Sequence, residues 1–148
     1  MIRQIVAIVV GLVVWLVGFT TLAFGVAQVW ASYGVHARQW MDQRVFTFPP
    51  AAASCNLILW ILAAVAAGWA AARIAKNRRT VWILAALIAL YLVAMHLVLE
   101  WSRFPWWYNL GVVIPAVPAV YVGARLAGLF GPAANRTSNR PSNHSSVA

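Results

Sequence analysis

Acidic residues are almost absent from this chain of 148 residues, which has two Asp or Glu against eleven Lys or Arg. A single cysteine, Cys55, excludes an intramolecular disulfide. The sequence also lacks a glycine-rich phosphate loop, a Gly-x-Ser-x-Gly motif and a His-Glu-x-x-His motif. These absences leave no known catalytic motif, so we expect no catalytic residues, no cofactor and no metal.

Hydrophobic residues make up 64% of the chain and charged residues only 9%. Soluble globular proteins contain roughly 45–50% apolar and about 25% charged residues. A soluble domain of this length buries only about two-thirds of its unfolded surface, so it could not hide so much apolar area. The composition therefore excludes a soluble monomer and a disordered chain, and it predicts that a lipid bilayer surrounds the protein.

Four apolar runs are long enough to cross that bilayer, because a hydrocarbon core of about 30 Å needs about 20 helical residues. The runs are continuous, unlike porin strands, which alternate with period two. The sequence predicts an all-α, polytopic bundle of four transmembrane helices in a domain 1–131, followed by a disordered cytoplasmic tail 132–148. The predicted spans are about 5–30, 51–72, 81–99 and 107–124.

The basic residues are divided unequally between the two sides of the predicted bundle. Four spans place the N-terminal segment, the second loop and the tail on one side, and these hold eight of the eleven Lys and Arg. Such a bias marks the cytoplasmic side of a membrane protein. We therefore expect a bacterial cytoplasmic (inner) membrane protein with both termini in the cytoplasm. The net charge of +9 then reports orientation, and no nucleic-acid partner is expected.

Small residues recur along the predicted spans at the spacing that lets membrane helices approach closely. The glycines expected at helix contacts are Gly11, Gly18, Gly25, Gly68, Gly111 and Gly123. In one interpretation these small residues pack the four helices of a single chain against one another. In the other, one ridge of small residues, with the fourth span as first candidate, forms the contact face of a homo-oligomer. Pro115 and Pro118 stand inside the fourth span and predict a kink near residues 109–117, because each removes a backbone donor.

Polar side chains of the spans gather near the side that is poor in basic residues. Ten of the nineteen aromatic residues lie in 30–48 or 101–108, in the two loops of that same side. A binding site is therefore expected there, as a shallow aromatic and polar vestibule that faces outward. Its candidate polar residues are Asn56, His96, Glu100, Arg103 and Asn109.

His96 and Glu100 are four residues apart and share a helix face, which Arg103 extends if the helix continues. In the simplest interpretation, Glu100 pairs with one of these neighbours and orients the helix end. An alternative is proton or ligand chemistry by these intramembrane groups. A further alternative is half of a metal site that His36 and Asp42 complete, although no three ligands have a diagnostic spacing.

Three stretches of the chain carry a resemblance to known proteins. They are GLVVW at 11–15, AGWAAARIA at 67–75, and FPWWYNL at 104–110 with IP at 114–115 and GARL at 123–126. They resemble a widespread, uncharacterised group of small four-span bacterial integral membrane proteins. In that group a Trp-Tyr pair is commonly followed by His, where this chain has Asn109. The resemblance implies a four-helix fold over most of 1–130 and no known activity.

Three functional hypotheses follow. The first is a non-enzymatic integral membrane protein, an accessory or envelope-associated component that acts through packing and its aromatic face. The second is a small oligomeric transporter or channel, although no carboxylate lies mid-span where ion coupling needs one. The third is a membrane enzyme or a lipid- or quinone-binding protein that uses the vestibule. The lipid bilayer is the expected partner, together with further copies of the chain or other membrane proteins.

Overall fold

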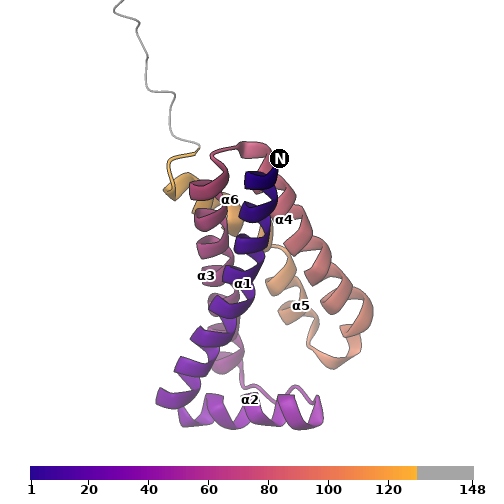
Figure 1. Cartoon of the computed structure of the whole chain (residues 1–148). Coiled ribbons are helices and arrows are strands. Elements are labelled where there is room, and N and C mark those ends of the chain that lie inside the picture. Colours follow the sequence, from indigo (N-terminus) through magenta and orange to yellow (C-terminus); the bar gives the residue numbers. More distant parts are fainter. Residues whose placement is uncertain (130–148) are drawn as a thin grey trace, which may run out of the picture.

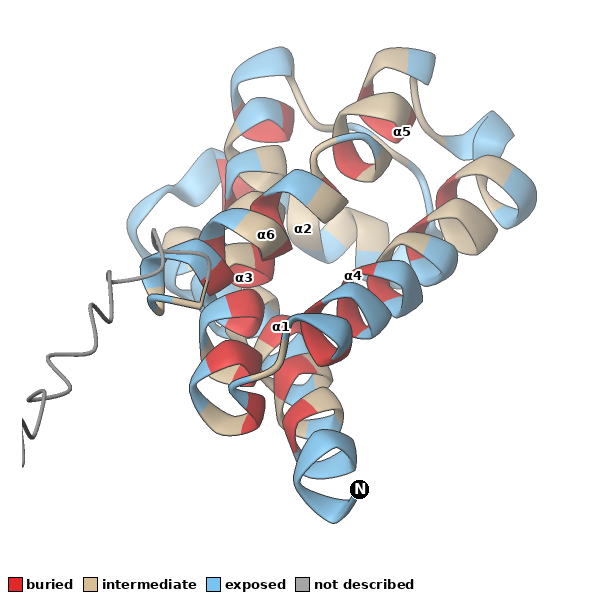
Figure 2. Ribbon diagram, turned by 90° about the horizontal axis from the view of Figure 1, so that it is seen from above, coloured by how far each residue is buried: buried red, intermediate tan, exposed pale blue. Residues whose placement is uncertain are grey.

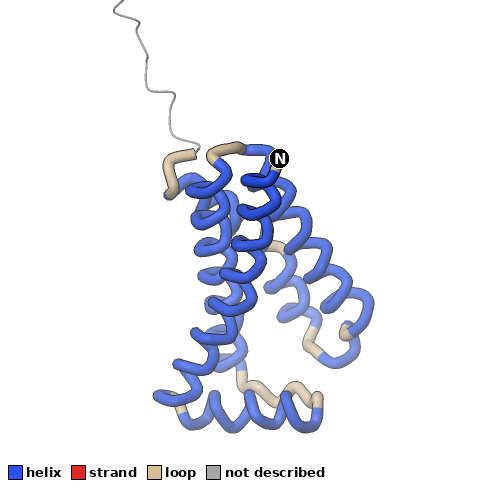
Figure 3. The backbone as a smooth tube through the Cα atoms, in the orientation of Figure 1, coloured by secondary structure: helices blue, strands red, loops and turns tan. Residues whose placement is uncertain are grey.

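The computed structural model describes residues 1–129, and this part of the chain is helical apart from short links (Figures 1 and 3). The order of elements is α1 (Ile2–Val29), α2 (Ala31–Gln43), α3 (Pro50–Ala75), α4 (Arg78–Leu92), a π-helical segment (Val93–Leu99), a 3-10 turn (Trp101–Arg103), α5 (Trp106–Val113) and α6 (Ala116–Leu126). No strand occurs in this range, which confirms the all-α fold class. The predicted tail, 132–148, lies outside the described residues.

Four stretches of helix are long and apolar enough to cross a membrane, as predicted. They are Ile2–Val29, Pro50–Ala75, Arg78–Leu99 and Trp106–Leu126, and each bound lies within three residues of the expected span. The first stretch has 28 residues, which is about 42 Å of helix. Because the hydrocarbon core is about 30 Å thick, this helix must tilt or extend beyond it.

The two ends of the bundle differ in composition. The N-terminus, the α3–α4 turn and the end of α6 lie together at one end, which we call the basic end (Figure 1). Its basic residues are Arg3, Arg73, Lys76, Arg78, Arg79 and Arg125. The Arg3 side chain donates a hydrogen bond to the carbonyl oxygen of Ile74, which fastens α1 to the end of α3. The opposite end holds α2 and the links 44–49 and 100–105, and we call it the aromatic end.

Helix α2 was not predicted, because the sequence alone suggested a loop between the first two spans. The α1 helix stops at Trp30, whose backbone is extended (φ −124°, ψ 92°), and α2 then crosses the aromatic end. Tyr33 and Gly34 are buried there. A Cβ added to Gly34 would lie 2.9 Å from the carbonyl oxygen of Ala27, so the two helices meet at backbone distance. A helix that lies across the end of a span is typical of the membrane interface.

Helices α3 and α6 also meet at backbone distance, in the half of the bundle toward the basic end. A Cβ added to Gly68 would fall on the carbonyl oxygen of Val120, and one on Gly123 would fall on that of Val65. Both helices carry further buried alanines, and Ala63 and Ala71 of α3 lie beside Gly18 and Gly11 of α1. The buried alanines are Ala63, Ala64, Ala67, Ala71, Ala72, Ala119 and Ala124. Small residues thus bring the two backbones together, as expected for membrane helices. This part of the fourth-span ridge is used inside the chain.

The other glycines predicted at helix contacts lie in different surroundings. A Cβ added to Gly11 or to Gly111 would lie 3.0 Å or less from a leucine methyl group of a neighbouring helix. At Gly18 the nearest atom would be 4.0 Å away. Gly25 is exposed, and an added Cβ would meet no atom of the described residues within 4 Å. The structure therefore places Gly11 and Gly111 at contacts and leaves Gly25 without one.

The fourth span is interrupted at Ile114 and Pro115, which separate α5 from α6. Pro115 has no N–H to give to the carbonyl group four residues back, and its ring crowds that turn. Pro118 lies in the first turn of α6, where a backbone N–H has no partner within the helix in any case. The predicted break therefore occurs at Pro115, and Pro118 belongs to the start of the next helix.

The helices diverge toward the aromatic end (Figure 1). The hairpin of α4, its π-helical extension and α5 leans away from α1 and α3. Figure 2 shows that buried residues occupy the facing sides of the helices, whereas exposed residues point outward. A π-helical turn is wider than an α-helical one and is often found at functional sites. A wedge lies between this hairpin and the helices α1 and α3, and it holds the cavity that forms the candidate site.

Candidate functional site

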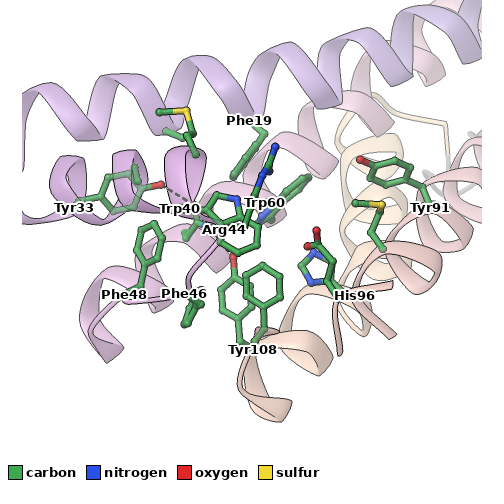
Figure 4. Close-up of a pocket in the computed structure, with 17 residues that line it drawn as sticks. Phe19, Tyr33, Trp40, Arg44, Phe46, Phe48, Trp60, Tyr91, His96 and Tyr108 are labelled. Atoms are coloured by element: carbon green, nitrogen blue, oxygen red, sulfur yellow. Dashed lines mark hydrogen bonds between the residues drawn. The ribbon is translucent and has the colours of Figure 1, made fainter. Parts of the chain in front are cut away.

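A cavity of about 260 Å³ lies in the wedge at the aromatic end (Figure 4). Aromatic side chains from α1, α2, α3, the α4–α5 hairpin and the link 44–49 form most of its wall. These nine residues are Phe19, Tyr33, Trp40, Phe46, Phe48, Trp60, Tyr91, Phe104 and Tyr108. Four polar or charged residues also line it, namely Arg44, Asn56, His96 and Glu100. The cavity is partly open, and α2 contributes Tyr33, Ala37, Trp40 and Met41 to its wall.

The link 44–49 contributes two of these rings, and a hydrogen-bonded cluster holds the link against α2. The Thr47 hydroxyl donates to Oε1 of Gln39 over 2.7 Å and accepts from Nδ1 of His36 over 2.8 Å. The ring of Phe46 then lies 4.9 Å from that of Tyr108, between centroids. His36 thus has a local structural partner. No group of three His, Cys, Asp or Glu side chains within residues 1–129 could hold a metal ion.

Stacked rings close the cavity on the side toward the basic end. Phe19 stacks on Trp60 with centroids 3.8 Å apart, and Trp15 lies 5.2 Å from Trp60 and 5.4 Å from Tyr91. A second void lies beyond these rings, lined in part by Trp15 and Trp60, and its volume is only about 10 Å³. The indole N–H of Trp15 is buried without a partner in the described part of the chain. The cavity therefore ends at these rings and does not continue along the bundle.

A chain of three polar side chains crosses the cavity wall. The Tyr33 hydroxyl donates to Oδ1 of Asn56 over 2.7 Å, and Nδ2 of Asn56 donates to the Tyr108 hydroxyl over 2.5 Å. Tyr33 and Tyr108 are 1% and 2% exposed, so both hydroxyls are removed from water. Burial raises the pKa of the Tyr33 hydroxyl, and the nearby Tyr108 and Cys55 raise it further. Tyr33 is therefore a neutral donor at physiological pH.

A second polar network fixes His96, which lies in the π-helical segment at the end of the third span. Nδ1 of His96 lies 3.2 Å from Oδ1 of Asn109. The amide nitrogen of Asn109 donates to the backbone carbonyl oxygens of Trp101 and Phe104, over 3.3 and 3.4 Å. Asn109 is fully buried, so its amide joins α5 to the turn that precedes it. Asn109 thus lies behind His96 and positions the ring.

Glu100 and Arg103 form an ion pair with a nitrogen–oxygen distance of 3.7 Å. The helix ends at Leu99, and Arg103 follows in a 3-10 turn, so the helix face of His96 and Glu100 does not extend to Arg103. The Arg103 side chain is 49% exposed, whereas that of Glu100 is 16% exposed. Of the five predicted site residues, Asn56, His96 and Glu100 line the cavity, Asn109 supports it, and Arg103 faces away.

Sequence reasoning missed the residues that close the cavity from within the spans. Phe19, Trp60 and Tyr91 lie on three different spans, and nothing in their spacing along the chain relates them. Tyr33 lies on the unpredicted helix α2. The signal that could have found α2 is the spacing of Tyr33, Ala37 and Trp40, which recur at helical intervals and all line the cavity.

No protein-family model matches the chain, and no curated protein or solved structure matches it. The resemblance to small four-span bacterial membrane proteins therefore stays a prediction. Among the lining residues Glu100 is the single carboxylate, so the cavity holds no pair of facing carboxylates.

Proposed function

We propose that this chain is a non-enzymatic integral membrane protein that binds a small, neutral, mainly apolar molecule at its aromatic end. The observation that carries the proposal is the cavity of about 260 Å³ lined by nine aromatic side chains. Ligand sites are typically concave and apolar with a few placed polar groups. A dry cavity of about 150 Å³ is large enough for benzene, so this one has room for a single substituted ring.

Charge supports a neutral ligand. Arg44 and Glu100 both line the cavity and carry opposite formal charges. Arg44 lies over the Trp40 ring, 5.8 Å from its centroid, and Glu100 pairs with Arg103. The two formal charges of the lining are of opposite sign, so the cavity carries no net charge that would compensate an ionic ligand for leaving water.

A bacterial cytoplasmic membrane with both termini in the cytoplasm fits this proposal. The basic end carries six of the nine Lys and Arg among the described residues, and basic residues favour the cytoplasmic side. The cavity would then open on the outer side. A reporter that is active only in the cytoplasm, fused after Ala148, should be active, whereas an inactive fusion beside an active periplasmic reporter would contradict this orientation.

Uptake of toluene by the purified protein in lipid nanodiscs tests the binding function. Equilibrium dialysis should show one saturable site per chain above the uptake of empty nanodiscs. The variant Ala23→Phe, which fills the cavity, should lose this site. The variant Ala66→Phe adds the same atoms to an exposed face of α3 and should keep it. Wild-type uptake equal to that of empty nanodiscs would contradict the proposal.

A transporter is less well supported. The helices of the basic half meet at backbone distance around Gly68 and Gly123, and the cavity stops at Trp15 and Trp60. A pathway through one chain would have to separate these contacts. The accessory or envelope-associated role agrees with a binding protein that carries out no chemistry.

A further inference from the structure

The hydrogen bonds of the cavity wall define which polar group a ligand must carry. Two networks reach the cavity, the Tyr33–Asn56–Tyr108 chain and the His96–Asn109 pair. Each contains groups whose donor and acceptor roles follow from chemistry, because a carbonyl oxygen only accepts and an amide nitrogen only donates. The ligand that these groups would select rests on the proposed binding function of the cavity.

The Tyr33–Asn56–Tyr108 chain leaves one hydroxyl proton unused. The amide of Asn56 offers one oxygen to Tyr33 and one nitrogen to Tyr108. The Tyr108 hydroxyl accepts from Nδ2 of Asn56 and from the indole N–H of Trp60, since both groups only donate. Its own O–H must therefore donate elsewhere, and no side chain of residues 1–129 is recorded as its acceptor. Turning the amide over would only transfer the free proton to Tyr33. In either case a buried hydroxyl donor lacks an acceptor.

The His96 network leaves one acceptor unused. The nitrogen of Asn109 must face the carbonyl oxygens of Trp101 and Phe104, because these oxygens can only accept. Its oxygen therefore faces Nδ1 of His96, which must carry the proton. In a neutral imidazole the other nitrogen, Nε2, is then a bare acceptor. No residue of the described chain donates to Nε2.

The donor and the acceptor belong to neighbouring rings of the cavity wall. The rings of His96 and Tyr108 lie 6.0 Å apart between centroids, and both line the cavity (Figure 4). Phe104 packs against both, at 5.2 Å from each ring. Nε2 of His96 is not among the buried polar atoms of residues 1–129 that lack a partner, so this acceptor is open to the cavity. A ligand that carries both a donor and an acceptor at one position could pair with both groups at once.

We infer that the cavity binds a neutral aromatic ring that carries a hydroxyl group, that is, a phenol. A phenol hydroxyl can donate to Nε2 of His96 and accept from the tyrosine hydroxyl, while its ring stacks among Phe46, Phe104 and Trp60. A plain hydrocarbon ring leaves both groups unpaired. A ring with only a carbonyl or an ether oxygen leaves His96 unpaired. The phenol ring can come from a free phenol or from the head of a lipid-soluble quinol.

A ligand series in nanodiscs tests this inference on the unaltered protein. The probes are p-cresol, p-xylene, in which a methyl group replaces the hydroxyl, and 4-methylanisole, which accepts but cannot donate. After each affinity is corrected for uptake by empty nanodiscs, p-cresol should bind about tenfold more tightly than p-xylene, with 4-methylanisole between them. Equal affinities for p-cresol and p-xylene would overturn the phenol assignment and leave the binding function standing. No binding of any probe would overturn both.

Two variants locate the effect. The variant His96→Phe keeps a ring but removes the acceptor, so p-cresol should bind no better than 4-methylanisole while the affinity for p-xylene is unchanged. The matched control Tyr121→Phe removes a tyrosine hydroxyl at the basic end, where Tyr121 stacks on Trp82, and should leave all three affinities unchanged. If His96→Phe keeps the full preference for p-cresol, the assignment of His96 as the acceptor is wrong.

A fourth probe separates the two sources of the phenol ring. A hydroquinone with a ten-carbon alkyl chain carries the same hydroxyl on a lipid-soluble molecule. Corrected binding that is tighter than that of p-cresol would identify a quinol head group, whose chain leaves the cavity into lipid. Exclusion of this probe, together with tight binding of p-cresol, would identify a free phenol. Both outcomes support recognition of a phenol hydroxyl.

Discussion

The distance between helices is set differently in the two halves of this bundle, the basic half toward the basic end and the aromatic half toward the aromatic end. In the basic half, Gly68 and Gly123 allow α3 and α6 to touch through their backbones. In the aromatic half, nine rings stand between the helices and leave a cavity of about 260 Å³. The α3–α6 contact of the basic half is therefore closed, whereas the helices of the aromatic half leave an open wedge.

The difference shows how side-chain size decides where a ligand can fit. Glycine and alanine have no rotamers and leave no space between helices, so their contact depends on backbone position alone. Large flat rings cannot fill a wedge completely, and polar groups among them need partners. We therefore expect the basic half to be sensitive to added atoms and the aromatic half to be sensitive to lost hydrogen bonds.

The largest effect is expected from Gly123→Val in the basic half. The new side chain would overlap the carbonyl oxygen of Val65, and the two helices would have to move apart along their whole contact. Overpacking in a dense core costs about 1–3 kcal/mol, and more where backbone must move. The yield of monodisperse protein in detergent and its thermal unfolding midpoint should both fall sharply.

Gly25→Val is the matched control for this prediction. The same atoms are added to a glycine of α1 that has no atom of the described residues within 4 Å of an added Cβ. Its unfolding midpoint should stay close to that of the wild type. Equal damage by both substitutions would mean that the loss arises from helix propensity, and the comparison of the two halves would then fail.

The basic half could be predicted in large part from the sequence. Its contacts are made by small residues at helical spacing within long apolar runs, and these signals are local. Gly68 and Gly123 were expected at helix contacts, and they do lie between α3 and α6. The alanines expected to form ridges on the second span are buried, and two of them, Ala63 and Ala71, lie beside glycines of α1. Pro115 also breaks the fourth span where the missing amide requires it. Gly25 shows the limit, because spacing alone cannot tell which face of a helix meets a neighbour.

The aromatic half could be predicted only in composition. Asn56, His96 and Glu100 were found because polar residues in a span are rare. Their partners depend on the turn of α2, the π-helical segment and the splay of the hairpin, all of which follow from tertiary packing. Asn109 was expected among the polar residues, but its bonds to the carbonyl oxygens of Trp101 and Phe104 arise only when the link 100–105 folds back.

Asn109→Leu tests the aromatic half with a change that keeps the side-chain size. The substitution leaves Nδ1 of His96 and two partly buried carbonyl oxygens without partners, so the free energy of unfolding should fall by about 1–3 kcal/mol. Titration with a denaturing detergent, followed by tryptophan fluorescence, measures this change. Gln28→Leu, at an exposed position of α1, should change stability by less than about 0.5 kcal/mol. An Asn109 variant as stable as the wild type would show that the polar network is dispensable.

The smallest effect is expected at Lys76, in the turn between α3 and α4. Its backbone is left-handed (φ 50°, ψ 31°), a conformation that costs an L-residue about 1–2 kcal/mol. Glycine removes this strain but loses about 0.5–1 kcal/mol through its more flexible unfolded state, so Lys76→Gly should stabilise the protein by about 0.5 kcal/mol. Lys76→Ala removes the same charge but keeps the Cβ, and it should bring no gain. If both variants gain the same stability, loss of charge repulsion in this basic turn is the cause. The left-handed backbone of Lys76 then stores no strain that glycine could release.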